Sequence, residues 1–76
     1  METIIEIIKE LKPGAVIDEN TRLIDDKILD SLAMISLIAE LGDEFDVEIT
    51  AQDIVPENFE TVSSIYKMIE RLEAED

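Results

Sequence analysis

Apolar residues recur at helical spacing in three separate segments of this chain, and that pattern is the strongest constraint on its fold. The segments cover residues 3–12, 31–45 and the stretch from residue 62 onward. In each, apolar side chains return every three or four residues, which is the period of one face of an α-helix. We therefore predict an all-α fold: a small bundle of three main helices plus one short helix, with a long first loop.

A long connection, residues 13–30, separates the first two predicted helices. Pro13 and Gly14 stop the first helix, because proline disfavours helical backbone in the residue before it. A structureless stretch of this length is uncommon in a small domain, and such loops often carry function. Its apolar residues are Val16, Ile17, Leu23, Ile24, Ile28 and Leu29. We expect these side chains to hold the loop against the helices.

The later helices differ in how clearly they show a buried face. The last one has a regular apolar stripe after a capping threonine, Thr61: Val62, Ile65, Ile69 and Leu72. The middle one is apolar on most sides, and we predict a core face of Leu32, Ile35, Ala39 and residues 41–45, widened by Met34, Leu37 and Ile38. Between them, the pattern from Thr50 to Asp53 predicts a short helix over residues 51–54, before Pro56.

The size and composition of the chain exclude many kinds of chemistry. At 76 residues it has room for one domain, residues 1–76, with a core that can line one small cavity or groove. It contains no cysteine and no histidine, so it has no thiolate zinc site, no disulfide and no Ser-His-Asp triad. The acidic residues lack the alternation of a calcium loop. We expect no catalytic residue and no metal, and a protein that is not itself an enzyme.

The net charge of −14 limits the partners of the chain. It disfavours nucleic acid and anionic membranes, favours a monomer through self-repulsion, and speeds encounter with basic partners. No basic residue lies between Lys27 and Lys67, while nine acidic residues do. That window is either a solvated surface or a docking face for a basic partner. The chain has no apolar run long enough to cross a bilayer and no signal-peptide pattern, so we expect a cytoplasmic protein without membrane insertion.

Ser31 is the one candidate for chemistry, at the junction between the long loop and the middle helix. An Asp-Ser pair at such a junction is an ordinary N-cap, and Asp30 or Ser31 can take that role. A helix start also presents unpaired N–H groups, which would tolerate a phosphodiester attached to the serine. No base stands near Ser31 in the sequence to activate it, which suits a residue modified by another enzyme.

The chain resembles the acyl carrier protein family. The resemblance is carried by residues 28–32, Ile-Leu-Asp-Ser-Leu, by the apolar helix over residues 33–41, and by residues 44–49, Glu-Phe-Asp-Val-Glu-Ile. Length, acidity, helix order and loop placement agree across nearly the whole chain. The family folds as a right-handed bundle of three main helices with a short third helix. Its serine receives 4′-phosphopantetheine from coenzyme A, and the arm's thiol carries acyl or aminoacyl groups as thioesters.

The resemblance implies roles for particular residues and partners. Ser31 resembles the modified serine, and Asp30 and Leu32 resemble the flanking residues that a phosphopantetheinyl transferase reads. An acyl- or aminoacyl-activating enzyme would load the arm, and a downstream acyl transferase or condensing enzyme would receive the cargo. We expect the residues that meet partners to be Leu29, Asp30, Leu32, Ala33, Met34, Ser36 and Ala39, with Glu40, Asp43 and Glu44 steering basic partners.

Three alternatives stay open at this point. The first is a D-alanyl or peptidyl carrier, which an adenylating enzyme loads, rather than a carrier of fatty acid synthesis. The chain is similar to such carriers in two places: the stretch after Ser31 has no charge before Glu40, and residues 53–61 resemble the same region of D-alanyl carriers. The second alternative is a small acidic interaction domain with no prosthetic group. The third is a minimal enzyme that relies on carboxylates alone.

Overall fold

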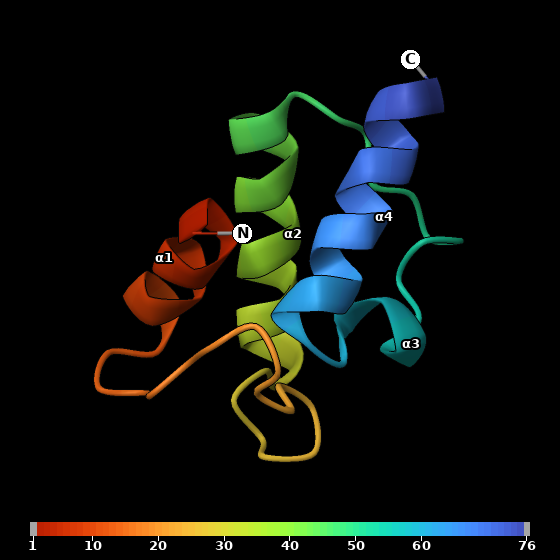
Figure 1. The fold of residues 1–76 in the computed structure, drawn as a ribbon. Helices are drawn as coiled ribbons and strands as arrows, with labels where there is room; N and C mark the ends of the chain where they lie inside the picture. Colours follow the sequence, from red (N-terminus) through yellow and green to blue (C-terminus); the bar gives the residue numbers. More distant parts are fainter. Residues whose placement is uncertain (1, 76) are drawn as a thin grey trace.

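The computed structural model describes residues 2–75 and forms four helices, with no strand in that range. The helices are α1 (Glu2–Leu11), α2 (Ser31–Phe45), α3 (Pro56–Phe59) and α4 (Val62–Glu75). Helix α1 packs against both α2 and α4, and the short α3 packs against α4 (Figure 1). The predicted all-α fold, with three longer helices, one short helix and a long first loop, is confirmed.

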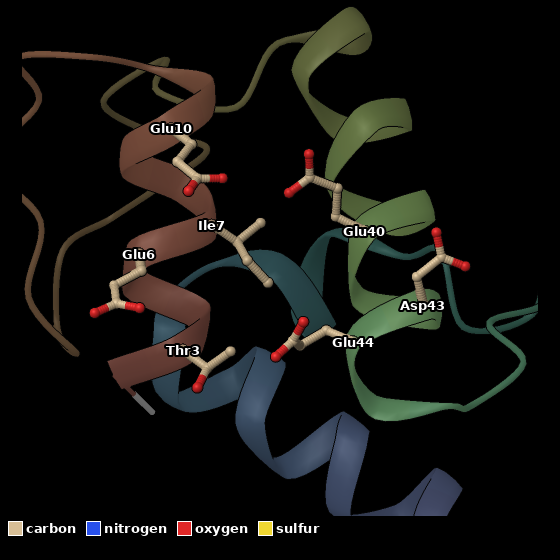
Figure 2. A pocket seen from close by; sticks show the side chains of 7 residues that line it. All are labelled: Thr3, Glu6, Ile7, Glu10, Glu40, Asp43 and Glu44. Atoms are coloured by element: carbon tan, nitrogen blue, oxygen red, sulfur yellow. The ribbon is translucent and has the colours of Figure 1, made fainter.

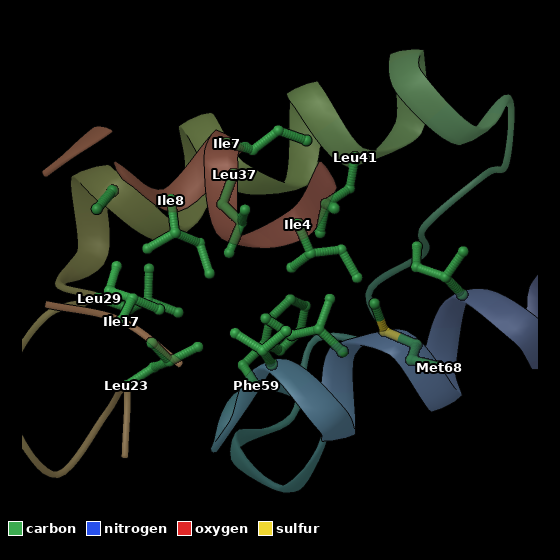
Figure 3. Close-up of a cluster of buried hydrophobic side chains, with 14 residues drawn as sticks. Ile4, Ile7, Ile8, Ile17, Leu23, Leu29, Leu37, Leu41, Phe59 and Met68 are labelled. Atoms are coloured by element: carbon green, nitrogen blue, oxygen red, sulfur yellow. The ribbon is translucent and has the colours of Figure 1, made fainter. Parts of the chain in front are cut away.

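One hydrophobic core joins all four helices and the first loop (Figure 3). Helix α1 contributes three isoleucines, and α4 contributes the predicted stripe together with Met68, which the stripe omitted. The fully buried members include Ile4, Ile8, Leu23, Leu37, Leu41, Phe59, Val62, Ile65, Met68 and Ile69. Leu72, the last residue of the predicted stripe, is half-buried at the edge.

The predicted core face of α2 is wrong at three of its positions. Leu32 and Ile35 are 78% and 66% exposed, and Ala39 is also exposed. Leu37 and Leu41 are buried as predicted, and Ala33, which the prediction left out, is buried with them. Because nearly every position early in this helix is apolar, its periodicity could not select one face. Helix α2 buries the residues at i, i+4 and i+8 and leaves Leu32 and Ile35 in solvent.

The predicted helix over residues 51–54 is also wrong. Thr50 and Asp53 do make the expected bonds, since the Thr50 N–H and hydroxyl both donate to Asp53 Oδ2 at 3.1 Å, but they close only a turn. Pro56 forces Val55 into extended backbone, with φ −127° and ψ 149°, so no helix can run through it. The helix begins at Pro56 itself, where a missing N–H costs nothing.

The long first loop is held against the helices by its other apolar residues, as predicted, but Val16 is 91% exposed and the prediction is wrong for that residue. Leu23 is fully buried, and Ile17 and Leu29 are nearly so. The Leu23 N–H donates to the carbonyl of Glu60 at 2.8 Å, next to α3, and Ile28 and Leu29 both donate back to the Leu23 carbonyl. These bonds bring the chain to the start of α2 by a fixed path.

Asp30 caps α2 and anchors it to the end of α1. Its Oδ1 accepts the Ala33 N–H at 2.8 Å, and its Oδ2 accepts from Lys12 Nζ at 3.2 Å. The hydrogen bond from Ala33, followed by the one from Lys12, lowers the pKa of Asp30 below its ordinary value of 3.8. Both bonds favour the ionised carboxylate. The helix start therefore depends on Asp30 being charged.

Acid should weaken the fold through this residue. Because the folded-state pKa of Asp30 lies below its unfolded value, its stabilising contribution is present above about pH 4 and is lost as pH falls through the folded pKa. We expect the unfolding free energy of the parent to fall more steeply from about pH 5 to pH 2.5 than that of Asp30→Asn, which keeps a capping oxygen but cannot ionise. Urea denaturation at each pH measures the unfolding free energy of both proteins.

The matched control is Asp26→Asn, which removes an exposed acid of the first loop. Its pH profile should follow the parent. If Asp30→Asn also follows the parent, the carboxylate of Asp30 does not hold the helix start.

Candidate functional site

Ser31 is the first residue of α2, and its side chain is exposed. Since Asp30 takes the capping role, the Ser31 hydroxyl is not needed to satisfy the helix start. Within residues 2–75 the structure gives this hydroxyl no hydrogen-bond partner and no base to activate it. It is an accessible nucleophile for another enzyme's reaction, and a phosphodiester fits there without displacing any contact of the fold.

The other serines are less suited to modification. Ser63 donates from its hydroxyl to the Glu19 carbonyl, and Ser64 shares a hydrogen bond with Thr61. Both are half-buried on α4. Ser36 is exposed, but it lies within α2 beyond the first turn. Ser31 alone combines exposure with a place at the end of the long loop.

The structure divides the residues that we expected to meet partners. Leu32, Ser36 and Ala39 are exposed on α2, as expected. Ala33 and Leu29 are buried, with only 8% and 6% of their surface exposed. The prediction that these two side chains meet a partner is therefore wrong. They belong to the core instead, because α2 turns the strip that begins at Ala33 inward. Met34 is half-buried and packs against the same core.

An exposed apolar face therefore runs along α2 beside Ser31. We call Leu32, Ile35, Ser36 and Ala39 the α2 docking face. They repeat at i, i+3, i+4 and i+7, so they lie along one side of the helix. Ile35 was missed as a surface residue because the sequence could not fix the rotation of α2. Contiguous exposed apolar side chains of this kind mark an interaction surface.

The three acids expected to steer partners lie on the α1 side of α2. Glu40, Asp43 and Glu44 border a hollow of about 280 Å³, across which stand Glu6 and Glu10 of α1 (Figure 2). Asp43 and Glu44 are exposed, and Glu40 is half-buried. No basic residue lines the hollow, so its negative potential is not neutralised locally. It can attract a basic surface over a distance of about a Debye length.

Lys12 is the residue near the site that sequence reasoning missed. Its bond to Asp30 is the one ion pair found among residues 2–75, and it places a cation one residue from Ser31. The two residues are 18 positions apart, and no local pattern connects them.

Two other features are absent from the described residues. No group of three or more acidic side chains is placed to hold a metal ion in residues 2–75. No helix in that part of the chain has the length and apolar character that crossing a bilayer requires.

The chain is similar to known proteins over most of its length. A family model described as "Phosphopantetheine attachment site" matches residues 2–69. The D-alanyl carrier protein of Bacillus cereus (strain B4264) is 27% identical over 73 residues, covering 93% of this chain and 92% of that protein. That of Bacillus anthracis (strain CDC 684 / NRRL 3495) has the same identity and coverage.

A solved structure is also similar. One chain of a structure described as the crystal structure of an FAD-dependent dehydrogenase superposes with a TM-score of 0.79 and 38% identity, covering 87% of this chain and 96% of that one. The family match spans α1, the whole first loop, α2, α3 and the first half of α4. The chain therefore belongs to the phosphopantetheine-attachment family, and it is a carrier protein whose prosthetic group is 4′-phosphopantetheine.

Proposed function

We propose that Ser31 is the attachment residue and that the arm carries an aminoacyl or acyl group between partner enzymes. The observation that carries this proposal is the exposed Ser31 hydroxyl at the start of α2, left without a structural task because Asp30 caps the helix. The arm supplies the thiol that forms the thioester, which the chain itself lacks, having no cysteine. The residues of the chain hold the arm's root in place and present it.

The whole chain, residues 1–76, acts in this proposal as one carrier domain in the cytoplasm that is not itself an enzyme. A single core that includes α1, α2, α3, α4 and the first loop supports one domain. The half-buried and bonded serines of α4 and the absence of histidine leave no apparatus for turnover by the chain alone.

The cargo in this proposal is an aminoacyl group loaded by an adenylating enzyme. Two observations support it over fatty acid synthesis. The similar proteins from the two Bacillus species are D-alanyl carrier proteins. The α2 docking face is apolar, with Leu32 and Ile35 in solvent, which suits contacts made by burial rather than by ion pairs. A phosphopantetheinyl transferase and a downstream acyl transferase or condensing enzyme complete the set of partners.

Intact-protein mass spectrometry tests the attachment residue. After incubation with coenzyme A and a broad-specificity phosphopantetheinyl transferase, we expect the parent and Ser36→Ala to gain one phosphopantetheine and Ser31→Ala to gain none. Ser36→Ala is the matched control, because it removes the other exposed serine of α2.

Two outcomes would contradict the proposal. In the first, Ser31→Ala gains a phosphopantetheine; in the second, none of the three proteins gains one although a control carrier does. In the second case the acidic interaction domain becomes the leading function, with the hollow between α1 and α2 as its basic-partner surface.

An FAD-dependent dehydrogenase is a further partner class that we propose. The similar solved chain is about as long as this one, because the match covers most of both. A helical domain of this size has no room to enclose a flavin as well as a substrate. A carrier-bound thioester oxidised by a separate flavin enzyme accounts for a carrier-like chain in a structure so described.

Flavin absorbance reports this partnership directly. Mixed with the dehydrogenase of that structure, the aminoacyl-loaded protein should bleach the flavin, because its cargo gives up two electrons and two protons: a hydride to the flavin and a second proton to a base of that enzyme. The same protein with an empty arm should not. Equal bleaching by loaded and empty protein, or by neither, would count against a dehydrogenase partner.

A further inference from the structure

A groove lies at the far end of α2 from Ser31, and it shares only Asp43 with the acidic hollow and Ala39 with the α2 docking face. It is formed between the C-terminal half of α2 and the segment that follows it, residues 46–49, and its volume is about 590 Å³. Half-buried Ile38, Val47 and Ile49 line it and pack against the core. The groove also has three exposed carboxylates: Asp43, Asp46 and Glu48. No basic residue lines it.

Gly42 makes this groove possible. Helix α2 ends at Asp46 in the left-handed conformation, with φ 53°, and the N–H groups of Asp46 and Val47 both donate to the Gly42 carbonyl. The chain thereby folds back over the helix. A Cβ at residue 42 would lie 3.2 Å from the Val47 carbonyl oxygen, closer than ordinary contact. The bare glycine surface leaves the space open.

Ser31 and the groove lie on the same side of α2. Ser31, Ile35, Ile38 and Gly42 follow one another at i, i+4, i+7 and i+11, so they form one line along the helix. At 1.5 Å per residue, Gly42 is about 16 Å from Ser31 along the helix axis. Figure 1 shows the two ends of α2 on opposite ends of the bundle, with the following segment leaving from the far end.

The phosphopantetheine arm matches that distance. Its chain from the serine oxygen to the sulfur has roughly fourteen bonds, as many as about five residues of polypeptide, and five extended residues span about 16–18 Å. Exposed Ile35 and half-buried Ile38 give the arm an apolar path between Ser31 and the groove. An arm lying along this line ends at the groove rather than beyond it.

We propose that this groove holds the aminoacyl end of the loaded arm, with Asp43, Asp46 and Glu48 around its α-ammonium and Ile38, Val47 and Ile49 against its side chain. The inference rests on the proposed function, because it needs an arm on Ser31 and an aminoacyl cargo. The charge complementarity selects the class of cargo: a small amino acid carries a positive charge at neutral pH, whereas a simple acyl group does not. Salt should weaken the interaction, since the carboxylates are exposed.

The test compares two cargoes that differ only in the ammonium group. Alanyl and propionyl groups are attached to the arm of the ¹⁵N-labelled protein through an amide in place of the thioester, so that neither hydrolyses. Mass spectrometry first establishes one loaded arm on Ser31. The amide chemical shifts of Gly42 and residues 46–49 are then compared with those of the protein with an empty arm.

We expect the alanyl group to shift these amides at least twofold more than the propionyl group, and high salt to remove the difference. The double variant Asp43→Asn/Glu48→Gln should reduce the alanyl shifts at least twofold. Asp26→Asn/Glu57→Gln, which removes the same charge from exposed positions elsewhere, should leave them unchanged.

Equal shifts from the two cargoes, equal effects of the two double variants, or shifts confined to residues around Ser31 would overturn the groove assignment while leaving the carrier function intact. A missing mass increase would overturn the attachment at Ser31 and this inference with it, so the two failures are distinguishable.

Discussion

Burial of one strip of α2 sets the rotation on which the rest of the site depends. Ala33, Leu37 and Leu41 face inward against a core to which α1 contributes Ile4 and Ile8. Burying one leucine side chain contributes about 1.5–3 kcal/mol, so two of them outweigh most surface interactions of the helix. Each residue turns the helix by 100°, and a slip of one position would move Ser31 and the docking face to a different side.

The two ends of the helix decide which apolar strip of α2 is the buried one, because its apolar pattern alone fits more than one face. At the start, buried Leu29 and the Asp30 cap fix where α2 begins, and the Leu23–Glu60 backbone bond holds the loop that precedes them. At the end, Asp46 turns the chain back over Gly42. With both ends held, Leu32 and Ile35 have to remain in solvent. The cost of exposing them is consistent with a surface that other proteins cover transiently.

Electrostatics act over a longer range than this packing. The chain carries −14 charge and shows one ion pair over residues 2–75, between Lys12 and Asp30 beside Ser31. The remaining acids repel one another and are held in place by the core rather than by cations. A high net charge of one sign disfavours self-association through an apolar face and favours encounter with partners that carry basic surfaces.

The sequence was sufficient to predict the helix count, the bounds of α2 and the anchored loop, because each rests on a local signal. Examples of such signals are Pro13, the capping residue Asp30 and the stripe from Val62 to Ile69. The face of α2 could not be predicted, since Leu32 and Ile35 are as apolar as Leu37 and Leu41. Nor could the Lys12–Asp30 contact, which depends on how two helices meet.

The position of α3 shows the same limit. The capping pattern from Thr50 to Asp53 forms its side-chain bonds, yet the helix begins only at Pro56, because proline decides the backbone of Val55. Local hydrogen bonds alone did not indicate at which of the two neighbouring positions, Ala51 or Pro56, a helix would begin. Packing of Phe59 into the core favours the later one.

The central claim is that α2 buries Leu37 and presents Ile35 to partners. Its most direct test is the kcat/KM for phosphopantetheine transfer to Ile35→Glu, compared with that for Leu37→Ala. We predict that Ile35→Glu keeps the parental unfolding free energy and lowers kcat/KM about tenfold, which corresponds to about 1.4 kcal/mol. Leu37→Ala should lose about 2–5 kcal/mol of stability, with transfer to its folded fraction unchanged. A destabilised Ile35→Glu, or one modified at the parental rate, would contradict the assignment of Ile35 to the partner face.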